Sequence, residues 1–193
     1  MAKEKDKDIA KYDIKWLKNR VLNGEKPDYV FFWGFKPKWT GNIDISCLSQ
    51  MYATTFVIDG IIYNCAEQFF MSTKALFFND NEIENKIMDC TDPRDMKKLG
   101  RIVKGFDEKK WIPVAYKTVI SGNYQKFLQN RQIKEFLLAT GDSVLVEASP
   151  YDSIWGIGIA ASDEKNIDVF KWQGTNLLGF ALMEVRDMLK LAL

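Results

Sequence analysis

Glu67 and Lys74 are residues whose types and spacing could support chemistry, and both fall in a predicted helix, residues 65–78. With 3.6 residues per turn, their seven-residue separation places both side chains on one helix face, roughly two turns apart. An unprotonated lysine amine is a nucleophile, and a carboxyl group can transfer protons in the same reaction. The structural alternative is a capping-box glutamate that follows Asn64, together with a solvated lysine. The spacing alone favours this alternative.

A second candidate region contains Glu147, which lies within an apolar run typical of a strand, residues 143–149. A carboxylate buried there needs a partner or a pocket, whereas a strand with one exposed face explains it equally well. The next segment, residues 149–158, combines a carboxylate, an indole ring and two glycines at which a ligand can approach the backbone. These residues are Asp152, Trp155, Gly156 and Gly158.

The composition narrows the possible chemistry. The chain of 193 residues has no histidine, which excludes Ser-His-Asp and Cys-His catalysis and histidine-bound zinc. Its three cysteines are widely spaced and odd in number, so they predict neither disulfides nor a metal site, and no cofactor is expected. A net charge of +1 indicates no general attraction to nucleic acid. Without a signal peptide or a membrane-spanning apolar run, we expect a soluble cytoplasmic protein.

The pattern of strands and helices predicts an α+β fold in a single compact domain, with a small sheet and surrounding helices. Residues 1–28 are predicted to form an amino-terminal helical extension, with its helix over residues 3–28, and residues 29–193 the main domain. Expected strands cover residues 29–33, 54–58, 61–63 and 143–149, with Asp59-Gly60 as a hairpin turn. Expected helices cover residues 65–78, 81–89, 92–100, 111–127, 131–139 and 176–189.

Ordered motifs throughout the main domain resemble those of the NADAR superfamily. They are Phe32-Trp33-Gly34, Leu48-Ser49 with Met51-Tyr52, Asp59-Gly60 with Tyr63, Ala66-Glu67-Gln68 with Met71 and Lys74-Ala75, Leu99-Gly100-Arg101, Trp111, Lys126-Phe127 with Gln129-Asn130, Thr140-Gly141-Asp142, residues 145–150 with Asp152, residues 155–158, and residues 174–179 with Leu182-Met183 and Arg186. Gln50 and Gln68 depart from the asparagine and histidine of many relatives. Both departures leave the glutamate and the lysine in place.

The resemblance implies an N-glycosidase that acts on ADP-ribosylated guanine or on a ribosylaminopyrimidine 5′-phosphate of riboflavin biosynthesis. It implies that Lys74 forms a Schiff base with the sugar, that Glu67 transfers protons, and that Asp152 orients the sugar hydroxyls. The substrate-binding residues expected from it are Trp33, Gly34, Ser49, Arg101, Glu147, Trp155, Gly156, Gly158 and Asn176.

Three other interpretations remain open. One is a two-carboxylate glycosidase that uses Glu67 with Asp152 or Glu147 and forms no lysine adduct. Another is a non-catalytic module that binds NAD or ADP-ribose, against which the presence of both Glu67 and Lys74 argues. The third is an interaction with nucleic acid. If the substrate is ADP-ribosylated DNA, we expect the contacts with its phosphates to be weak and sensitive to salt. The sequence does not indicate an oligomeric state.

Overall fold

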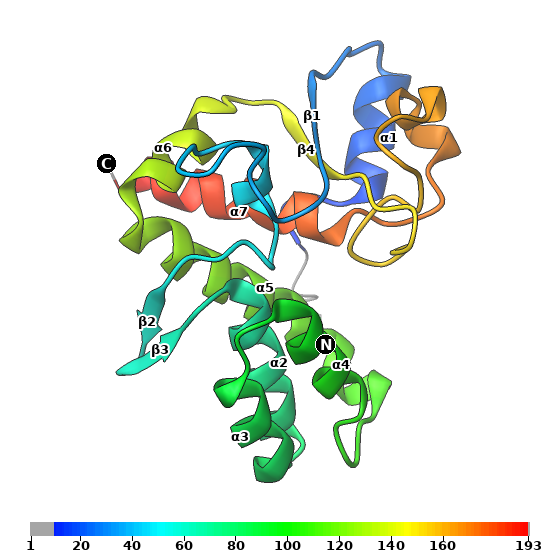
Figure 1. Cartoon of the computed structure of the whole chain (residues 1–193). Coiled ribbons are helices and arrows are strands. Elements are labelled where there is room, and N and C mark those ends of the chain that lie inside the picture. The colour runs from blue at the N-terminus through cyan, green and yellow to red at the C-terminus, as the bar shows by residue number, and fades with distance from the viewer. Residues whose placement is uncertain (1–9, 193) are drawn as a thin grey trace, which may run out of the picture.

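The computed structural model describes residues 10–192, and its element order confirms the predicted α+β class (Figure 1). It combines two small two-stranded sheets with helices. The strands are β1 (Tyr29–Phe32), β2 (Phe56–Ile58), β3 (Ile61–Tyr63) and β4 (Val144–Glu147). The helices are α1 (Ile14–Leu22), η1 (Ile45–Leu48), α2 (Ala66–Phe77), α3 (Asn81–Asp89), α4 (Pro93–Arg101), α5 (Glu108–Gln129), α6 (Arg131–Ala139), η2 (Glu164–Ile167), η3 (Val169–Lys171) and α7 (Leu177–Leu191), where η denotes a 3-10 helix.

Strands β1 and β4 form a parallel pair in the centre of the upper part of Figure 1. Residues 144, 145 and 146 are all fully buried, and α7 packs against β4. Of the two alternatives left open for this strand, the one with an exposed face is therefore wrong for β4, because parallel strands are commonly covered on both faces. In the register, Phe32 lies beside Glu147, so the carboxyl ends of both strands meet at one edge.

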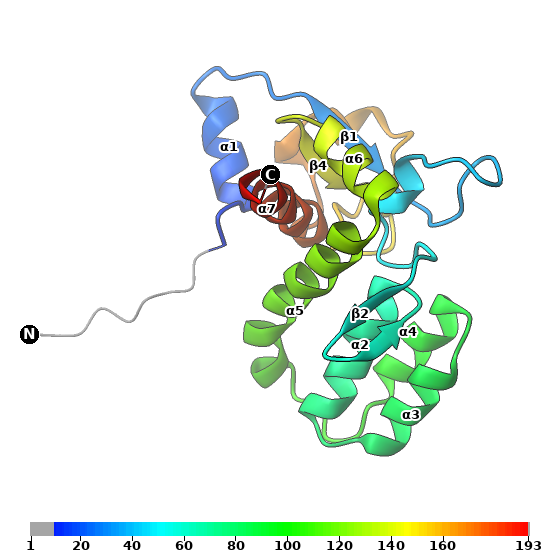
Figure 2. The same ribbon diagram turned by 90° about the vertical axis from the view of Figure 1, so that its left-hand side faces the viewer.

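Helix α5 connects two parts of the fold, one built around the β1–β4 pair and the other around α2 (Figure 2). It packs on α7 beside the β1–β4 pair and on α2, which is surrounded by α3, α4 and the hairpin. Asp107 accepts a hydrogen bond from the backbone N–H of Lys109 at the start of α5. The helix is longer than the predicted span of residues 111–127, and its contacts with α7 and α2 join the two parts of the core.

The local signals at residues 54–92 are partly confirmed. Asp59 and Gly60 both have positive φ, as a two-residue hairpin turn between β2 and β3 requires. The predicted cap of α2 by Asn64 is wrong, because Cys65 holds the cap position without a side-chain bond. Instead, the Gln68 side chain reaches back and accepts from the Asn64 N–H at 2.8 Å.

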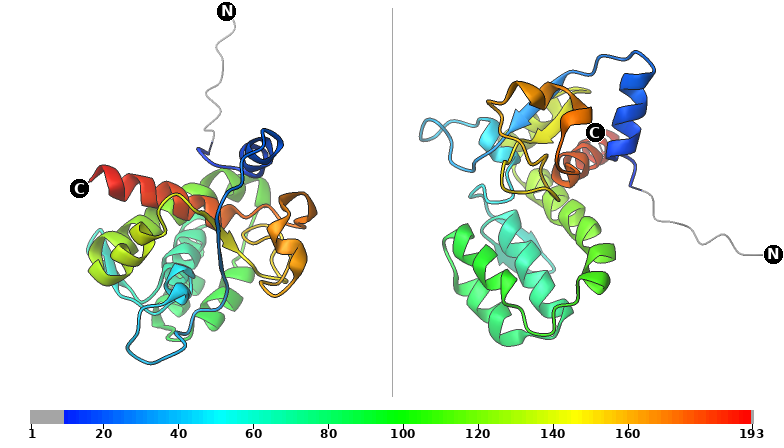
Figure 3. Two further views of the ribbon diagram at one scale, coloured as in Figure 1. Left: turned by 90° about the horizontal axis from the view of Figure 1, so that it is seen from above. Right: turned by 90° about the vertical axis from the view of Figure 1, so that its right-hand side faces the viewer.

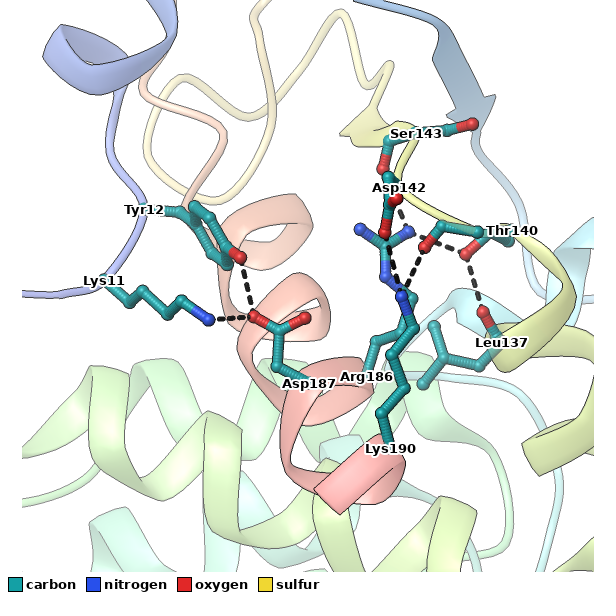
Figure 4. Close-up of polar contacts among 10 residues, drawn as sticks. Lys11, Tyr12, Leu137, Thr140, Asp142, Ser143, Arg186, Asp187 and Lys190 are labelled. Atoms are coloured by element: carbon teal, nitrogen blue, oxygen red, sulfur yellow. Dashed lines mark hydrogen bonds and ion pairs between the residues drawn. The ribbon is translucent and has the colours of Figure 1, made fainter. Parts of the chain in front are cut away.

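The amino-terminal helix is shorter than expected. Ile9 and the other residues before 10 lie outside the described part, and α1 begins at Ile14 because the Asp13 side chain accepts from the Trp16 N–H. The side chains of Lys11 and Tyr12 both donate to Asp187 of α7, which fastens this region to the main domain (Figure 4). The division of the chain at residue 28 stays a prediction.

Two surface features complete the description. The loop between β1 and η1 projects from the fold beside the carboxyl edge of the strands (Figure 3). Within residues 10–192, no helix combines the length and apolar character required to cross a membrane.

Candidate active site

A cleft of about 490 Å³ opens where the carboxyl ends of β1 and β4 approach the start of α2 and the flank of α4. Its lining comes from segments far apart in the sequence, which the central strand pair and α5 bring together. The lining residues are Trp33, Gly34, Phe35, Ser49, Gln50, Met51, Glu67, Phe70, Met71, Arg94, Lys97, Glu147, Ser149, Tyr151, Asp152, Trp155 and Leu178.

Glu67 lies in the first turn of α2 and is 5% exposed. Its backbone N–H donates to the Gln50 carbonyl at 2.9 Å, and its Oε1 atom has no hydrogen-bond partner among the described residues. Burial raises the pKa of its carboxyl to about 7, and the charge of Asp152 raises it as well, while Lys97 and Arg101 oppose the shift. Glu67 is therefore available as a proton donor near neutral pH.

Glu147 ends β4 and presents a second carboxyl group to the same cleft. Its Oε2 atom also has no hydrogen-bond partner among the residues that the structure describes. Burial raises its pKa to about 8, and the charge of Asp152 adds to this effect, whereas Lys97 lowers the pKa. A buried and a partly buried carboxyl group, both with pKa values raised toward or above neutral pH, are the main chemical feature of the cleft, since perturbed pKa values concentrate at functional sites.

Asp152 is held in a defined orientation beside these groups. Its Oδ1 atom accepts from the backbone N–H groups of Ile154 and Trp155, at 3.0 and 2.8 Å. Its Oδ2 atom lies 3.9 Å from the Lys97 amine. One carboxylate oxygen thus fixes the loop, and the other faces a cation in the cleft.

Lys97 and Arg94 of α4 are lining residues that the sequence interpretation missed. They stand three positions apart and share one helix face, which gives the cleft a positively charged side. The polar spacing was visible in the sequence, but a solvated face has the same pattern. The side chain of Arg94 also bonds with Asp92 at the start of the helix.

Aromatic rings form the remaining walls. Trp33 is 53% exposed, and its ring centroid lies 6.4 Å from that of Tyr151, a residue also missed from the sequence. On the inner side, Trp155 makes an edge-to-face contact with Phe70 at 5.4 Å between centroids. A planar base could stack on these surfaces.

Comparisons with known proteins identify the family of the chain. The model of the NADAR domain matches residues 31–190, which is most of the chain. The chain belongs to the NADAR domain family. It is 40% identical to N-glycosidase R617 of Acanthamoeba polyphaga mimivirus, over 84% of this chain and 97% of that protein. It is 27% identical to the riboflavin biosynthesis protein VVA0006 of Vibrio vulnificus, over 74% of this chain and 35% of that protein.

A solved structure shows the fold of a relative. The NMR structure of the Escherichia coli protein YbiA matches with a TM-score of 0.66 and 24% identity, over 87% of this chain and 88% of that one. The two proteins therefore share the NADAR fold.

Of the residues predicted from the NADAR resemblance, seven line the cleft: Trp33, Gly34, Ser49, Glu67, Glu147, Asp152 and Trp155. Lys74 does not. Its amine donates to the Gly100 carbonyl at 2.8 Å and lies 3.8 Å from the centre of the Phe106 ring. Met71 lines the cleft one turn earlier in α2, and Gly100 packs directly against Met71. Arg101 follows Gly100, is exposed and is also absent from the lining.

Three predicted site residues do not line the cleft but pack against the end of β4 and the loop that follows it. They are Gly156, Gly158 and Asn176. A Cβ atom at Gly156 would lie 2.9 Å from the Glu147 carbonyl, and Gly158 has a φ of +68°. The Asn176 amide accepts from the Glu147 N–H and donates to the Leu145 carbonyl. These three residues hold the loop after β4 in place, and a direct contact with substrate stays a prediction.

We predict that Trp155→Ala weakens substrate binding by about 5- to 150-fold, because stacking on one ring contributes roughly 1–3 kcal/mol. Thermal stability should fall much less than the roughly 3–5 kcal/mol typical of a truncated core tryptophan. Calorimetric titration and thermal melting measure the two effects. Trp39→Ala is the matched control, since Trp39 is 73% exposed and outside the cleft lining. Unchanged affinity with a large loss of stability would assign Trp155 to the core.

Proposed function

We propose that the cleft hydrolyses an N-glycosyl bond between a ribose carbon and a base nitrogen. The observation that carries this proposal is a pair of carboxyl groups in the cleft, the buried Glu67 and the partly buried Glu147, each with one buried oxygen that has no hydrogen-bond partner among the described residues. A base leaves a sugar readily only when its nitrogen is protonated, and carboxyl groups with raised pKa supply such protons near neutral pH. The name of the mimivirus relative, N-glycosidase R617, supports the same class of reaction.

The aromatic and cationic walls of the cleft support a substrate that carries a base and a phosphate. Trp33 and Trp155 could flank the base, while Lys97 and Arg94 could bind phosphate oxygens. We propose two candidate substrates, ADP-ribosylated guanine and a ribosylaminopyrimidine 5′-phosphate. The name of the Vibrio relative supports the second. In ADP-ribosylated DNA, the phosphates would add only local, salt-sensitive contacts.

In the proposed reaction, Glu67 gives its proton to the leaving nitrogen as the bond between carbon and nitrogen breaks. A water oxygen forms the new bond to the sugar carbon, and its proton returns to the Glu67 carboxylate. Asp152 orients the sugar hydroxyls, because its Oδ2 atom faces the cleft while Oδ1 is fixed by two backbone N–H groups. Glu147 contacts the substrate from the end of β4, in the same cleft.

A covalent route through Lys74 also remains a proposal, and it requires the lysine amine to move into the cleft. Burial lowers the pKa of its amine, which favours the nucleophilic form. To reach the sugar, however, the amine must leave the Gly100 carbonyl and pass Met71. The direct route, in which water attacks and the carboxyl groups transfer protons, needs no such movement. A chemical trap distinguishes the two routes.

The proposed function is tested by incubating the purified chain with each candidate substrate and quantifying the released base by liquid chromatography. Release of base from at least one substrate is expected. A protein that binds ADP-ribose by calorimetry but releases no base from either substrate would be a non-catalytic binding module instead.

The raised pKa values predict a distinct pH dependence. The donor must be protonated, so kcat/KM should fall about tenfold per pH unit once the pH exceeds the range of about 7 to 8. The two groups share a cleft, and the observed values will therefore belong to the pair. Initial rates between pH 5.5 and 9.5 provide the measurement. A flat or rising profile across this range would contradict the role of Glu67 as the acid.

The stability of the folded protein should also fall as the pH rises. The folded state holds protons that the unfolded chain loses near pH 4.5, the ordinary value for glutamate. The free energy of unfolding should therefore fall as the pH rises from about 4.5 through 7 to 8. Replacement of both glutamates by glutamine should flatten this dependence.

A further inference from the structure

Lys126 is a buried cation in α5 that the proposed reaction does not use. It is fully buried, and no carboxylate among the described residues influences its charge. Its amine donates to the carbonyls of Cys47 and Ser49, at 2.7 and 2.8 Å. Taking a charged group out of water is costly unless hydrogen bonds compensate, and an apolar side chain would avoid that cost. A role other than stability could explain a lysine at this position.

The Ser49 carbonyl belongs to the chain segment that forms one wall of the cleft, and the Cys47 carbonyl lies two residues before it. We call residues 49–51 the wall segment; all three of its residues line the cleft. The Ser49 carbonyl also accepts from the Tyr52 N–H, and the Ser49 hydroxyl accepts from the Met51 N–H. Lys126 therefore binds the wall segment at its first residue, on the side that faces α5.

A second side chain of α5 holds the same segment. Asn123, fully buried and one turn before Lys126, donates from its amide to the Gln50 side chain at 2.6 Å. Gln50 in turn accepts from the Glu67 N–H through its backbone carbonyl. A continuous set of hydrogen bonds thus leads from α5 through the wall segment to the first turn of α2.

We propose that Lys126 is a positioning residue which, together with Asn123, fixes the wall segment and thereby the place of Glu67 in the cleft. The proposal rests on the assignment of Glu67 to proton transfer. Burial lowers the pKa of the Lys126 amine to about 8, while Cys47 and Cys65 oppose this shift. A neutral amine retains two N–H donors, so the bonds to the Cys47 and Ser49 carbonyls both survive deprotonation.

The test replaces Lys126 with methionine, which keeps length and removes the donors. Thr118→Val is the matched control, because Thr118 is a buried polar residue of α5 whose hydroxyl donates to the Val114 carbonyl of the same helix. In Lys126→Met, amide hydrogen exchange at Glu67 and Tyr52 should accelerate at least about tenfold, and kcat should fall roughly 10- to 100-fold with little change in KM. Thermal melting should show a folded protein. The Thr118→Val control should change neither the amide exchange rates nor kcat.

A double-mutant cycle separates positioning from a general structural effect. If Lys126 acts through Glu67, adding Lys126→Met to Glu67→Gln should lower the remaining rate by less than about threefold. Full additivity, or unchanged exchange at the Glu67 amide, would overturn the proposal. If Lys126→Met does not fold, Asn123→Ala tests the same connection through Gln50 and should produce the same exchange pattern.

The exchange measurement also keeps this proposal distinct from the proposed function. If the wild-type chain released no base, accelerated exchange at Glu67 would still support the mechanical link, while catalysis would be rejected. If base release were normal in Lys126→Met despite accelerated exchange, the positioning role would be wrong.

Discussion

Glu67→Gln should lower turnover by about 10²- to 10⁴-fold while the protein remains folded and still binds its substrate. Glutamine keeps the shape of the side chain but cannot give a proton to the leaving nitrogen. The affected oxygen has no hydrogen-bond partner among the described residues, so the substitution breaks no side-chain bond there. Steady-state kinetics, thermal melting and ligand titration together measure the effect.

The control for this variant is Glu108→Gln. Glu108 lies in the first turn of α5, as Glu67 does in α2, but it is exposed and lies outside the cleft. Its substitution should leave the rate within about twofold of the wild type, as is usual for surface changes. If Glu67→Gln lost less than threefold in rate, the carboxyl group would have no part in the chemistry.

Lys74→Arg and Lys74→Ala should both abolish turnover and covalent trapping if the reaction passes through a Schiff base at this residue. The guanidinium of arginine stays protonated and cannot attack the sugar. Reduction with borohydride during turnover converts the carbon–nitrogen double bond to a stable link. Mass spectrometry should then find the sugar fragment on the wild-type peptide that contains Lys74.

The Lys74 amine lies outside the cleft lining, so the trapping experiment shows whether it moves to the substrate or takes no part in the reaction. Lys86→Arg on the surface of α3 is the control and should keep normal turnover and trapping. An adduct on Lys97, the amine that lines the cleft, would move the covalent step to α4. Normal turnover in Lys74→Ala without any adduct would leave the direct route through the carboxyl groups.

Short-range signals in the sequence predicted the elements of the fold well. The apolar run at residues 143–149 identified β4, and the Asp92-Pro93 pair marked the start of α4 correctly. The Asp59-Gly60 turn was also predicted, because only a few residue types accept positive φ at both positions. These features depend on neighbouring residues alone. The parallel pairing of β1 with β4 depends on residues more than a hundred positions apart, and no local pattern indicates it.

The candidate site was harder to predict because it is formed by tertiary packing. The spacing of Glu67 and Lys74 correctly placed both on one helix face, but the bond to Gly100 turns the lysine amine away from the cleft. Conversely, Lys97 resembles any solvated helix lysine in the sequence. Its position in the cleft follows from the packing of α4 on α2. Family resemblance supplied Glu147 and Asp152, which spacing alone left ambiguous.

The most direct test of the account is a product analysis with the purified wild-type chain and Glu67→Gln, using ribosylaminopyrimidine 5′-phosphate and ADP-ribosylated guanine in parallel. For at least one substrate, the wild type should release free base and free ribosyl product in equal amounts, quantified by mass spectrometry. Glu67→Gln should release almost none of either. Equal release by both proteins, or no release by the wild type from either substrate, would contradict hydrolysis of an N-glycosyl bond with Glu67 as the proton donor.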